Sequence, residues 1–200
     1  LAHKLTRDWK AAGLPIDIDA VIPVPDTART AALECATALG IKYREGFIKN
    51  RYVGRTFIMP NDEARQATIR TKLNPIRSEF AGKSVIIMDD SIVRGNTSRH
   101  MVKIAREMGA AKVYFASYSP PLLYPCLYGI DMATKREFIA RDRTDEEIAT
   151  ELGADAVVYQ TVDQMEDAVR SSGNSDLKFC NACFAGTYPT GDITETMLGD

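Results

Sequence analysis

Short apolar runs alternate along the chain with segments of helical spacing. Residues 20–24 form the first apolar run, and a helix is predicted over residues 28–39. Gly40 follows this helix, at the position where glycine commonly ends one. A second strand is predicted over residues 41–48. Strands that alternate with helices indicate an α/β fold with a mainly parallel, twisted sheet flanked by helices.

The second half of the chain continues this alternation. Residues 85–88 are the clearest buried strand, and strands are also predicted at 112–117 and 154–159. The helix after residue 98 carries four apolar residues on one face: Met101, Ile104, Ala105 and Met108. Capping boxes at Thr144 and Thr161 predict two further helix starts. A polar linker at 171–176 separates a predicted domain, residues 1–170, from a tail, residues 171–200.

Composition narrows the class of protein. With 200 residues, 45% of them apolar, the chain can build one sizeable core. A net charge of −2 gives no electrostatic footprint for nucleic acid. No window approaches the roughly 18 apolar residues of a membrane span, and no signal peptide is visible, so we expect a soluble cytoplasmic protein. The opening residues read as an amphipathic helix without a starting Met, which indicates a piece of a longer polypeptide.

The strongest chemical signal follows the strand at 85–88. Asp89 and Asp90 stand where that strand ends, and a hydroxyl-rich loop leads from them into a helix. Ligands of open α/β sheets bind at this edge, and helix N-termini bind phosphate. The two carboxylates suit a sugar diol or a hard cation such as Mg²⁺. The candidate substrate-binding residues of the loop are Ser91, Arg94, Gly95, Asn96, Thr97 and Ser98. The alternative is an acidic turn that caps an ordinary helix.

The run Val85-Ile-Ile-Met-Asp-Asp-Ser-Ile-Val-Arg-Gly-Asn-Thr-Ser98 resembles the motif with which type I phosphoribosyltransferases bind phosphoribosylpyrophosphate (PRPP). The resemblance implies the fold of that family. It also implies that Asp89 and Asp90 hold the ribose hydroxyls and Mg²⁺, while the loop cups the 5-phosphate. In the amidotransferases of this family a turn like residues 23–27 serves the pyrophosphate and metal side. Thr27 then falls at a metal contact, although Pro-x-Pro alone indicates only a turn.

Residues 49–60 mix bases with apolar residues and have no steady period. Composition alone favours a solvated basic loop. The segment nevertheless resembles, nearly residue for residue, the flexible loop of the amidophosphoribosyltransferases. That resemblance implies a lid over PRPP with Lys49, Tyr52 and Arg55 as catalytic residues. It also implies that Ile58 lines a passage for ammonia, which distinguishes the chain from enzymes that transfer ribose phosphate to a base.

Glutamine hydrolysis in the amidophosphoribosyltransferases uses an N-terminal cysteine, whereas this chain begins with Leu1. We therefore expect the N-terminal glutaminase domain to be absent from this chain. The chain would use free ammonia at most. Of its two histidines, His3 and His100, neither has an obvious cysteine partner in sequence, and His100 is predicted to lie on the surface of a helix.

The four cysteines fall into two groups. Cys35 shares a helical face with small apolar residues and is expected to be buried. Cys180 and Cys183 form a C-x-x-C pair, which alone is compatible with zinc, iron–sulfur, redox chemistry or no function. Some amidophosphoribosyltransferases carry a [4Fe–4S] cluster. Resemblance to them implies Cys126, Cys180 and Cys183 as three ligands, with the fourth outside the chain.

The resemblance implies a complete activity: transfer of ammonia to C1 of PRPP, which gives 5-phosphoribosylamine and pyrophosphate and opens purine synthesis. It further implies feedback inhibition by purine nucleotides and a homo-oligomer, with no nucleic-acid or membrane partner. Two rivals remain. One is a non-catalytic PRPP-binding regulator, and the other is a base-salvage phosphoribosyltransferase. Turnover of PRPP with ammonium against turnover with purine bases separates them.

Overall fold

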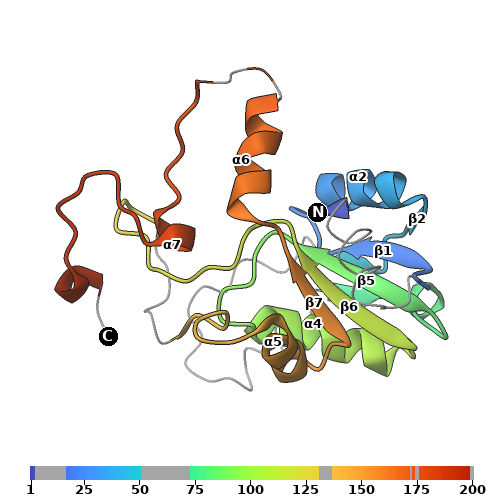
Figure 1. Ribbon diagram of the computed structural model, residues 1–200. Helices are drawn as coiled ribbons and strands as arrows, with labels where there is room; N and C mark the ends of the chain where they lie inside the picture. Colours follow the sequence, from blue (N-terminus) through green and yellow to red (C-terminus); the bar gives the residue numbers. More distant parts are fainter. Residues whose placement is uncertain (3–16, 51–72, 131–136, 172, 174–175, 199–200) are drawn as a thin grey trace.

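The computed structural model describes residues 1–2, 17–50, 73–130, 137–171, 173 and 176–198. At its centre lies a five-stranded sheet in the order β2-β1-β5-β6-β7, and every pairing in it is parallel (Figure 1). Its strands are β1 (Ala20–Pro23), β2 (Lys42–Tyr43), β5 (Ser84–Asp89), β6 (Lys112–Ser117) and β7 (Ala156–Tyr159). The prediction of an α/β fold with a parallel sheet is confirmed.

Helices cover both faces of the sheet. Helix α2 (Arg29–Leu39) lies on one face, while α4 (Asn96–Glu107) and α5 (Asp145–Leu152) lie on the other (Figure 1). In the part of the chain that the structure describes, the remaining helices are α6 (Val162–Ser171), α7 (Ala182–Ala185) and two 3₁₀ turns, Arg77–Glu79 and Glu195–Leu198. Among the described residues, no helix is both long and apolar enough to cross a bilayer.

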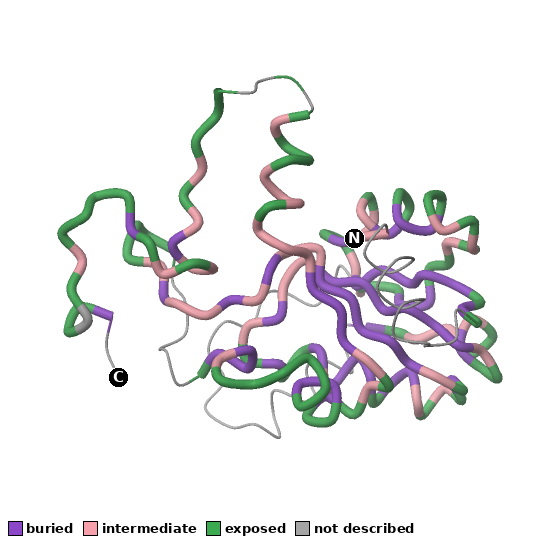
Figure 2. Tube along the Cα trace, viewed as in Figure 1, coloured by how far each residue is buried: buried purple, intermediate pink, exposed green. Residues whose placement is uncertain are grey.

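Strand β5 divides the core into two layers. Its side chains alternate between the faces of the sheet, as the two-residue period of a strand requires. Val85 and Ile87 join the cluster beneath α4 and α5, whereas Ile86 and Met88 join the cluster beneath α2. All four are fully buried, which Figure 2 shows as the purple centre of the sheet. A continuous apolar run is therefore the sequence signature of a strand covered on both faces.

Three predicted helix boundaries are confirmed by their local chemistry. Gly40 ends α2 in the left-handed conformation, with φ of 67°. At the start of α5, the Thr144 side chain accepts a hydrogen bond from the Glu147 backbone N–H, and the Glu147 carboxylate accepts one from the Thr144 N–H. This reciprocal pair is the predicted capping box. Before α6, the Thr161 hydroxyl oxygen accepts from the Gln164 N–H.

The prediction of a single strand over residues 41–48 is wrong. The chain instead forms β2 in the main sheet and then β3 (Phe47–Lys49), which pairs antiparallel with β4 (Leu73–Pro75) in a separate two-stranded sheet. The break comes at Gly46, whose backbone passes directly over the ring of Phe80. A Cβ at this position would lie 2.7 Å from Phe80 Cζ. The chain thus passes close to an aromatic ring where it leaves the main sheet.

The prediction that His100 lies on the surface of a helix is also wrong, because this residue is only 8% exposed. Helix α4 packs against both the sheet and α5, so more than one stripe of its surface is covered; His100 lies one turn before the buried Ile104. Cys35 is buried at 6% exposure, as predicted. The helix expected at the start of the chain falls largely at residues 3–16, outside the described residues.

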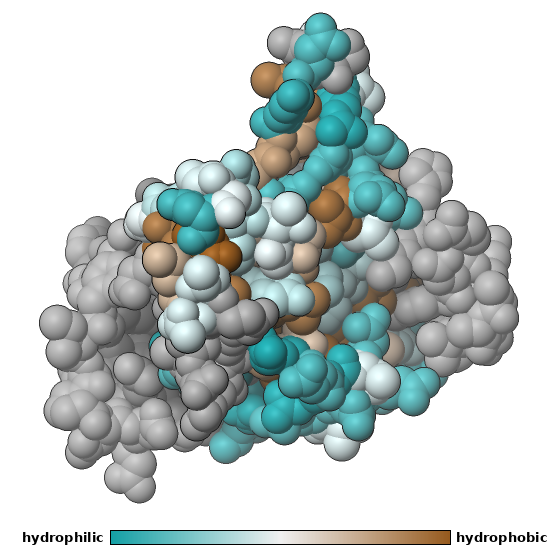
Figure 3. Space-filling view, turned by 60° about the vertical axis from the view of Figure 1, so that its left-hand side comes forward, coloured by the Kyte–Doolittle hydropathy of each residue, from teal (hydrophilic) through white to brown (hydrophobic). Residues whose placement is uncertain are grey.

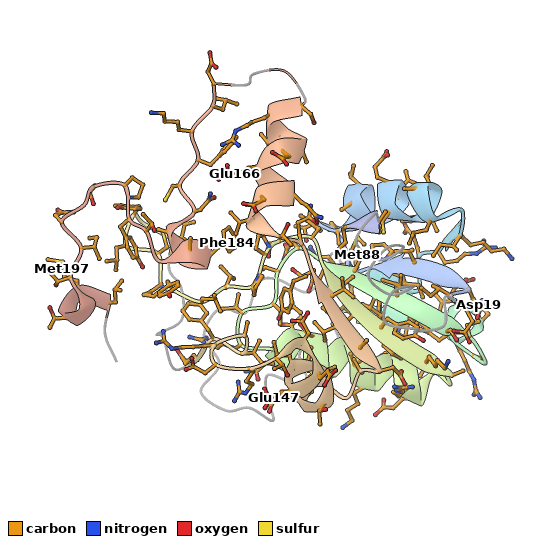
Figure 4. All side chains as sticks on the ribbon, in the orientation of Figure 1. Asp19, Met88, Glu147, Glu166, Phe184 and Met197 are labelled. Carbon is orange, nitrogen blue, oxygen red and sulfur yellow. The ribbon has the colours of Figure 1, made fainter. Side chains whose placement is uncertain are left out.

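Beyond β7 the chain leaves the sheet. Helix α6 projects from the body and has no buried residue, and residues 176–198 return beside it as a largely extended tail (Figures 1 and 2). The surface of this projecting part is mostly hydrophilic, with smaller apolar patches (Figure 3). Glu166 joins the two segments, since it pairs with Arg170 on α6 and accepts a hydrogen bond from Asn181 in the tail (Figure 4).

Candidate active site

Three strand ends meet at the carboxyl edge of the sheet. The Val24 N–H donates to Met88 O at 2.8 Å, which joins the turn after β1 to the end of β5. On the other side of β5, the Tyr118 N–H donates to Asp89 O at 3.2 Å. The Tyr118 hydroxyl also lies 3.4 Å from the carbonyl oxygen of Thr27. The acidic pair, the turn at 25–27 and the end of β6 therefore form one site, where ligands of such sheets bind.

The two carboxylates of the acidic pair differ in environment. Asp89 is only 7% exposed, and Asp90 is half-buried. Burial, and then the neighbouring charge of Asp90, raises the pKa of Asp89 to about 7, against a lowering contribution from the Asp90 N–H that it accepts. Asp90 accepts a hydrogen bond from the Ser91 hydroxyl at 3.2 Å. Asp90 is thus the more accessible hydrogen-bond acceptor. Asp89 lies behind it at the end of β5 and accepts a hydrogen bond from the Asp90 backbone N–H.

The loop between β5 and α4 presents a row of backbone donors. Within the described part of the chain, the N–H groups of residues 91–98 have no hydrogen-bond partner. Gly95 stands at the N-cap of α4 with φ of 76°, a left-handed conformation that favours glycine. Unpaired N–H groups at a helix N-terminus attract anions. The predicted phosphate loop therefore has the backbone arrangement that binding a phosphate requires.

The side chains of this loop are less uniform than its backbone. Ser98 is buried at 2% exposure, whereas Thr97 is exposed at the mouth of the loop. The Asn96 side chain accepts a hydrogen bond from Arg99 at 3.1 Å. Arg94 forms an ion pair with Glu137 through two N–O contacts of 3.0 Å. The structure thus brings all the predicted loop residues together, but it directs the Arg94 guanidinium to a protein carboxylate.

Of the predicted lid, residues 49–60, the structure describes only residues 49 and 50. Lys49 ends β3, and its Nζ lies 3.0 Å from the Asp26 carboxylate, in the turn that also carries the exposed Thr27. The peptide bond before Asp26 is cis. Lys49 therefore reaches the turn assigned to the leaving-group side. Tyr52, Arg55 and Ile58 lie outside the described residues, so their predicted roles stay predictions.

The cysteine segments pack together. Helix α7 begins inside the C-x-x-C pair and contains Cys183. The Cys183 carbonyl accepts hydrogen bonds from the N–H groups of Leu123 and Tyr124 at 2.9 and 3.0 Å. Burial raises the pKa of Cys183, with smaller contributions from Cys126 and Cys180. The backbone of Cys183 thus packs against residues 123–124, close in sequence to Cys126. Within the described residues, however, no group of three His, Cys, Asp or Glu side chains is arranged to hold a metal ion.

Sequence reasoning missed two residues at this site. Tyr118 extends β6 and closes the site against Thr27, and Glu137 pairs with Arg94 from a segment 43 positions later. A tyrosine after an apolar strand and an acid in a polar stretch carry no distinctive pattern. Their roles follow only from the tertiary packing.

Relatives of this chain share its sequence at high identity. It is 55% identical over 191 residues to an amidophosphoribosyltransferase of Saccharomyces cerevisiae, which covers 96% of this chain and 36% of that protein. An amidophosphoribosyltransferase of Escherichia coli is 46% identical over 198 residues, or 99% of this chain and 38% of the relative. The chain therefore spans somewhat more than a third of the curated relatives it matches. No protein-family model matches the chain.

Solved structures agree with the sequence relatives. The glutamine PRPP amidotransferase from Bacillus subtilis, solved with ADP and GMP, superposes with a TM-score of 0.75 at 43% identity, and the match covers 94% of this chain and 42% of that one. A structure described as the allosteric regulatory enzyme of purine biosynthesis gives 0.78 at 42% identity, covering 98% and 43%. The predicted phosphoribosyltransferase fold is confirmed by these likenesses.

Proposed function

The chain belongs to the amidophosphoribosyltransferase family, and on that premise we propose that it forms the PRPP-binding part of an enzyme that makes 5-phosphoribosylamine. In this reaction ammonia attacks C1 of PRPP, the bond from C1 to the pyrophosphate oxygen breaks, and the excess proton of the bound ammonia is released. The reaction would open purine synthesis. Glutamine would supply the ammonia in the longer protein.

One observation carries the proposal: an acidic pair and a row of unpaired N–H groups stand side by side at the carboxyl edge of the sheet. The N–H groups of residues 91–98 suit the 5-phosphate, because they offer donors and the positive end of the α4 dipole. Asp90, with Asp89 behind it, suits the 2- and 3-hydroxyls of ribose, because carboxylates accept hydrogen bonds from a diol. Together they match the two ends of a ribose 5-phosphate.

The protein's contribution to the reaction is electrostatic. Positive charge develops on the ribose ring and negative charge on the leaving pyrophosphate, so fixed acceptors and donors stabilise the transition state. Asp89 and Asp90 lie on the ribose side, and Lys49 lies beside the turn at 25–27, on the leaving-group side. Lys49 would exchange Asp26 for a pyrophosphate oxygen. The catalytic roles of Tyr52 and Arg55, and the ammonia passage at Ile58, remain proposals from the family resemblance.

A Mg²⁺ ion fits the donors at this edge in chemical type. Asp89, Asp90 and Thr27 offer hard oxygen atoms, and magnesium sites often combine one or two carboxylates with substrate phosphates. The substrate phosphates would complete such a site. Among the described residues, no group of three His, Cys, Asp or Glu side chains is arranged to hold a metal ion without them. When bound, the ion would add positive charge beside the pyrophosphate.

We extend the proposal to the cysteines. Cys126, Cys180 and Cys183 would hold a [4Fe–4S] cluster, with a fourth ligand outside the chain. Supporting this are the hydrogen bonds that dock α7, which contains Cys183, onto residues 123–124, close in sequence to Cys126. When bound, the cluster would link the tail, residues 171–200, to the body. Iron and sulfide content of anaerobically purified protein tests this, and a colourless, iron-free protein contradicts it.

Purine nucleotides would compete for the same loop. The B. subtilis relative was solved with ADP and GMP. A nucleoside 5′-phosphate shares the ribose 5-phosphate unit of PRPP, so the N–H row and the acidic pair can hold either ligand. Inhibition of this kind, and assembly as a homo-oligomer, are the partner proposals for this chain.

Pyrophosphate release from PRPP by the full-length enzyme tests the proposal. We expect turnover with ammonium and with glutamine, and none with purine bases. Turnover with purine bases alone would identify a salvage enzyme instead. PRPP binding without any turnover would identify a regulator.

A further inference from the structure

The phosphate loop is held from outside by one short segment, residues 137–139, which we name the strap. The Ile139 N–H donates to Val93 O at 2.9 Å. The Val93 side chain packs in a cluster with the buried Phe138. A Cβ on Gly95 would collide with Cδ1 of Ile139. Val93 and Gly95 therefore both rest on the strap, which forms the outer wall of the loop.

The hydrogen bond from Ile139 to Val93 also sets the direction of the next backbone donor. In a planar trans peptide, the C=O of one residue and the N–H of the next point in opposite directions. The bond between Val93 and Arg94 is trans. Because the Val93 carbonyl points at the strap, the Arg94 N–H points to the opposite, inner side of the loop. Within the described residues this N–H has no partner, so it is a preorganised donor for an anion.

The Arg94 side chain points to the outer side of the loop, toward the strap. Its Nη2 lies 3.0 Å from Glu137 Oε2, and its Nε lies 3.0 Å from Glu137 Oε1. This two-contact geometry fixes both the position and the plane of a guanidinium. The pair is almost half exposed, at 47% and 42%, so it contributes little to global stability. Its effect is local: it holds the side chain on the outer side while the backbone faces inward.

We infer that Glu137 is a positioning residue for PRPP binding, which acts by fastening Arg94 to the strap so that the backbone N–H of Arg94, and not its guanidinium, meets the 5-phosphate. The inference rests on the proposed function for the identity of the ligand. It assigns a role to a carboxylate that would repel the substrate if it were placed inside the site.

Four variants of the full-length enzyme test the inference: Glu137→Gln, Arg94→Met, the double variant and Glu151→Gln. The last is a matched control, because Glu151 on α5 forms an ion pair of similar exposure, 43%, with Arg99, which lies on α4 and outside the loop. The measurements are kcat, KM for PRPP, the Kd of ribose 5-phosphate by calorimetry, and Tm.

We expect Glu137→Gln to raise KM for PRPP and the Kd of ribose 5-phosphate by about two- to fivefold, the effect of losing one exposed ion pair, with kcat almost unchanged. Arg94→Met should do the same, and the double variant should be no worse than either single variant, because both remove one interaction. Glu151→Gln should leave both constants unchanged while Tm responds as in Glu137→Gln.

Two results would overturn the inference. A loss above about tenfold in Arg94→Met, the effect expected of a lost charged hydrogen bond, with normal or tighter binding in Glu137→Gln, would mean that the guanidinium binds the phosphate. If Glu137→Gln and Glu151→Gln change KM equally, Glu137 contributes to stability and does not position Arg94 for PRPP binding. If the wild-type enzyme lacks turnover, the proposed function fails separately, and the affinities for ribose 5-phosphate still decide the role of Glu137. Wild-type protein that does not bind this probe would refute both.

Discussion

Gly46 lies against the ring of Phe80, so close that a Cβ on Gly46 would stand 2.7 Å from Cζ and 2.9 Å from Cε2 of that ring. Phe80 in turn packs on Phe47, with ring centroids 5.1 Å apart, and both rings are buried. This contact places the end of β3, and with it Lys49, beside the turn at 25–27. A local packing constraint in the core thus positions a residue of the candidate site.

Substitution of Gly46 by Ala should destabilise the protein by about 1–3 kcal/mol, because overpacking forces a buried ring or the backbone to move. The measurement is the free energy of unfolding in urea. Phe80→Leu should relieve part of the clash, so the double variant should be more stable than the sum of the single effects predicts. Gly40→Ala is the contrast, since Gly40 has open space and only an unfavourable φ of 67°. If the coupling energy between Gly40→Ala and Phe80→Leu equals that between Gly46→Ala and Phe80→Leu, this explanation is wrong.

The sequence predicted the elements whose signals are local. The continuous apolar run at 85–88 predicts a strand covered on both faces, and Thr144 with Glu147 predicts a helix start, because the interacting residues are neighbours in the chain. The break at Gly46 could not be predicted this way, since it depends on the ring of Phe80, 34 positions later.

The same limit applies at the site. Asp89 and Asp90 are recognisable because strand, acids and loop follow one another in a single motif. Glu137 is recognisable only through its contact with Arg94, and Tyr118 only through its contact with Thr27. The residues proposed to bind ribose 5-phosphate lie in one local motif, whereas the residues that contact them come from separate segments.

Cys35 should resist alkylation in the folded protein. Burial raises its pKa to about 11, so at pH 8 its thiolate fraction falls to about one in a thousand, roughly a hundredfold below that of a thiol with a pKa near 9. The reaction rate should rise with pH up to about 11. Mass spectrometry after timed iodoacetamide treatment measures it, with the exposed Cys180 of iron-free protein as internal reference. The two thiols should react equally fast in denaturant; equal rates in folded protein would refute the burial argument.

Lys49→Met should lower kcat/KM for PRPP by about 10- to 100-fold in the full-length enzyme, because a charged hydrogen bond to the leaving group is worth about 1.5–3 kcal/mol. Lys42→Met serves as control, since Lys42 is an exposed lysine on the edge strand β2. Asp26→Asn should cost much less, because it removes the resting partner of Lys49, and a longer ion pair with Arg29, but no group that is proposed to bind the leaving group. An unchanged kcat/KM in Lys49→Met would contradict the proposal that Lys49 contacts the leaving pyrophosphate.

Tyr188→Phe should loosen the tail from the body. The buried Tyr188 hydroxyl donates to Pro125 O at 2.6 Å, directly before Cys126. Removing the donor leaves a buried carbonyl unpaired, at a cost of about 1–3 kcal/mol. Tyr128 is a close control: its ring packs on Tyr188 at 6.0 Å, but its hydroxyl bonds Thr190 in an exposed setting. We expect faster proteolysis of the tail, and faster iron loss where a cluster is bound, in Tyr188→Phe but not in Tyr128→Phe. If Tyr188→Phe leaves proteolysis of the tail unchanged, the buried hydrogen bond does not hold the tail, and docking rests on α7 and its contacts with residues 123–124.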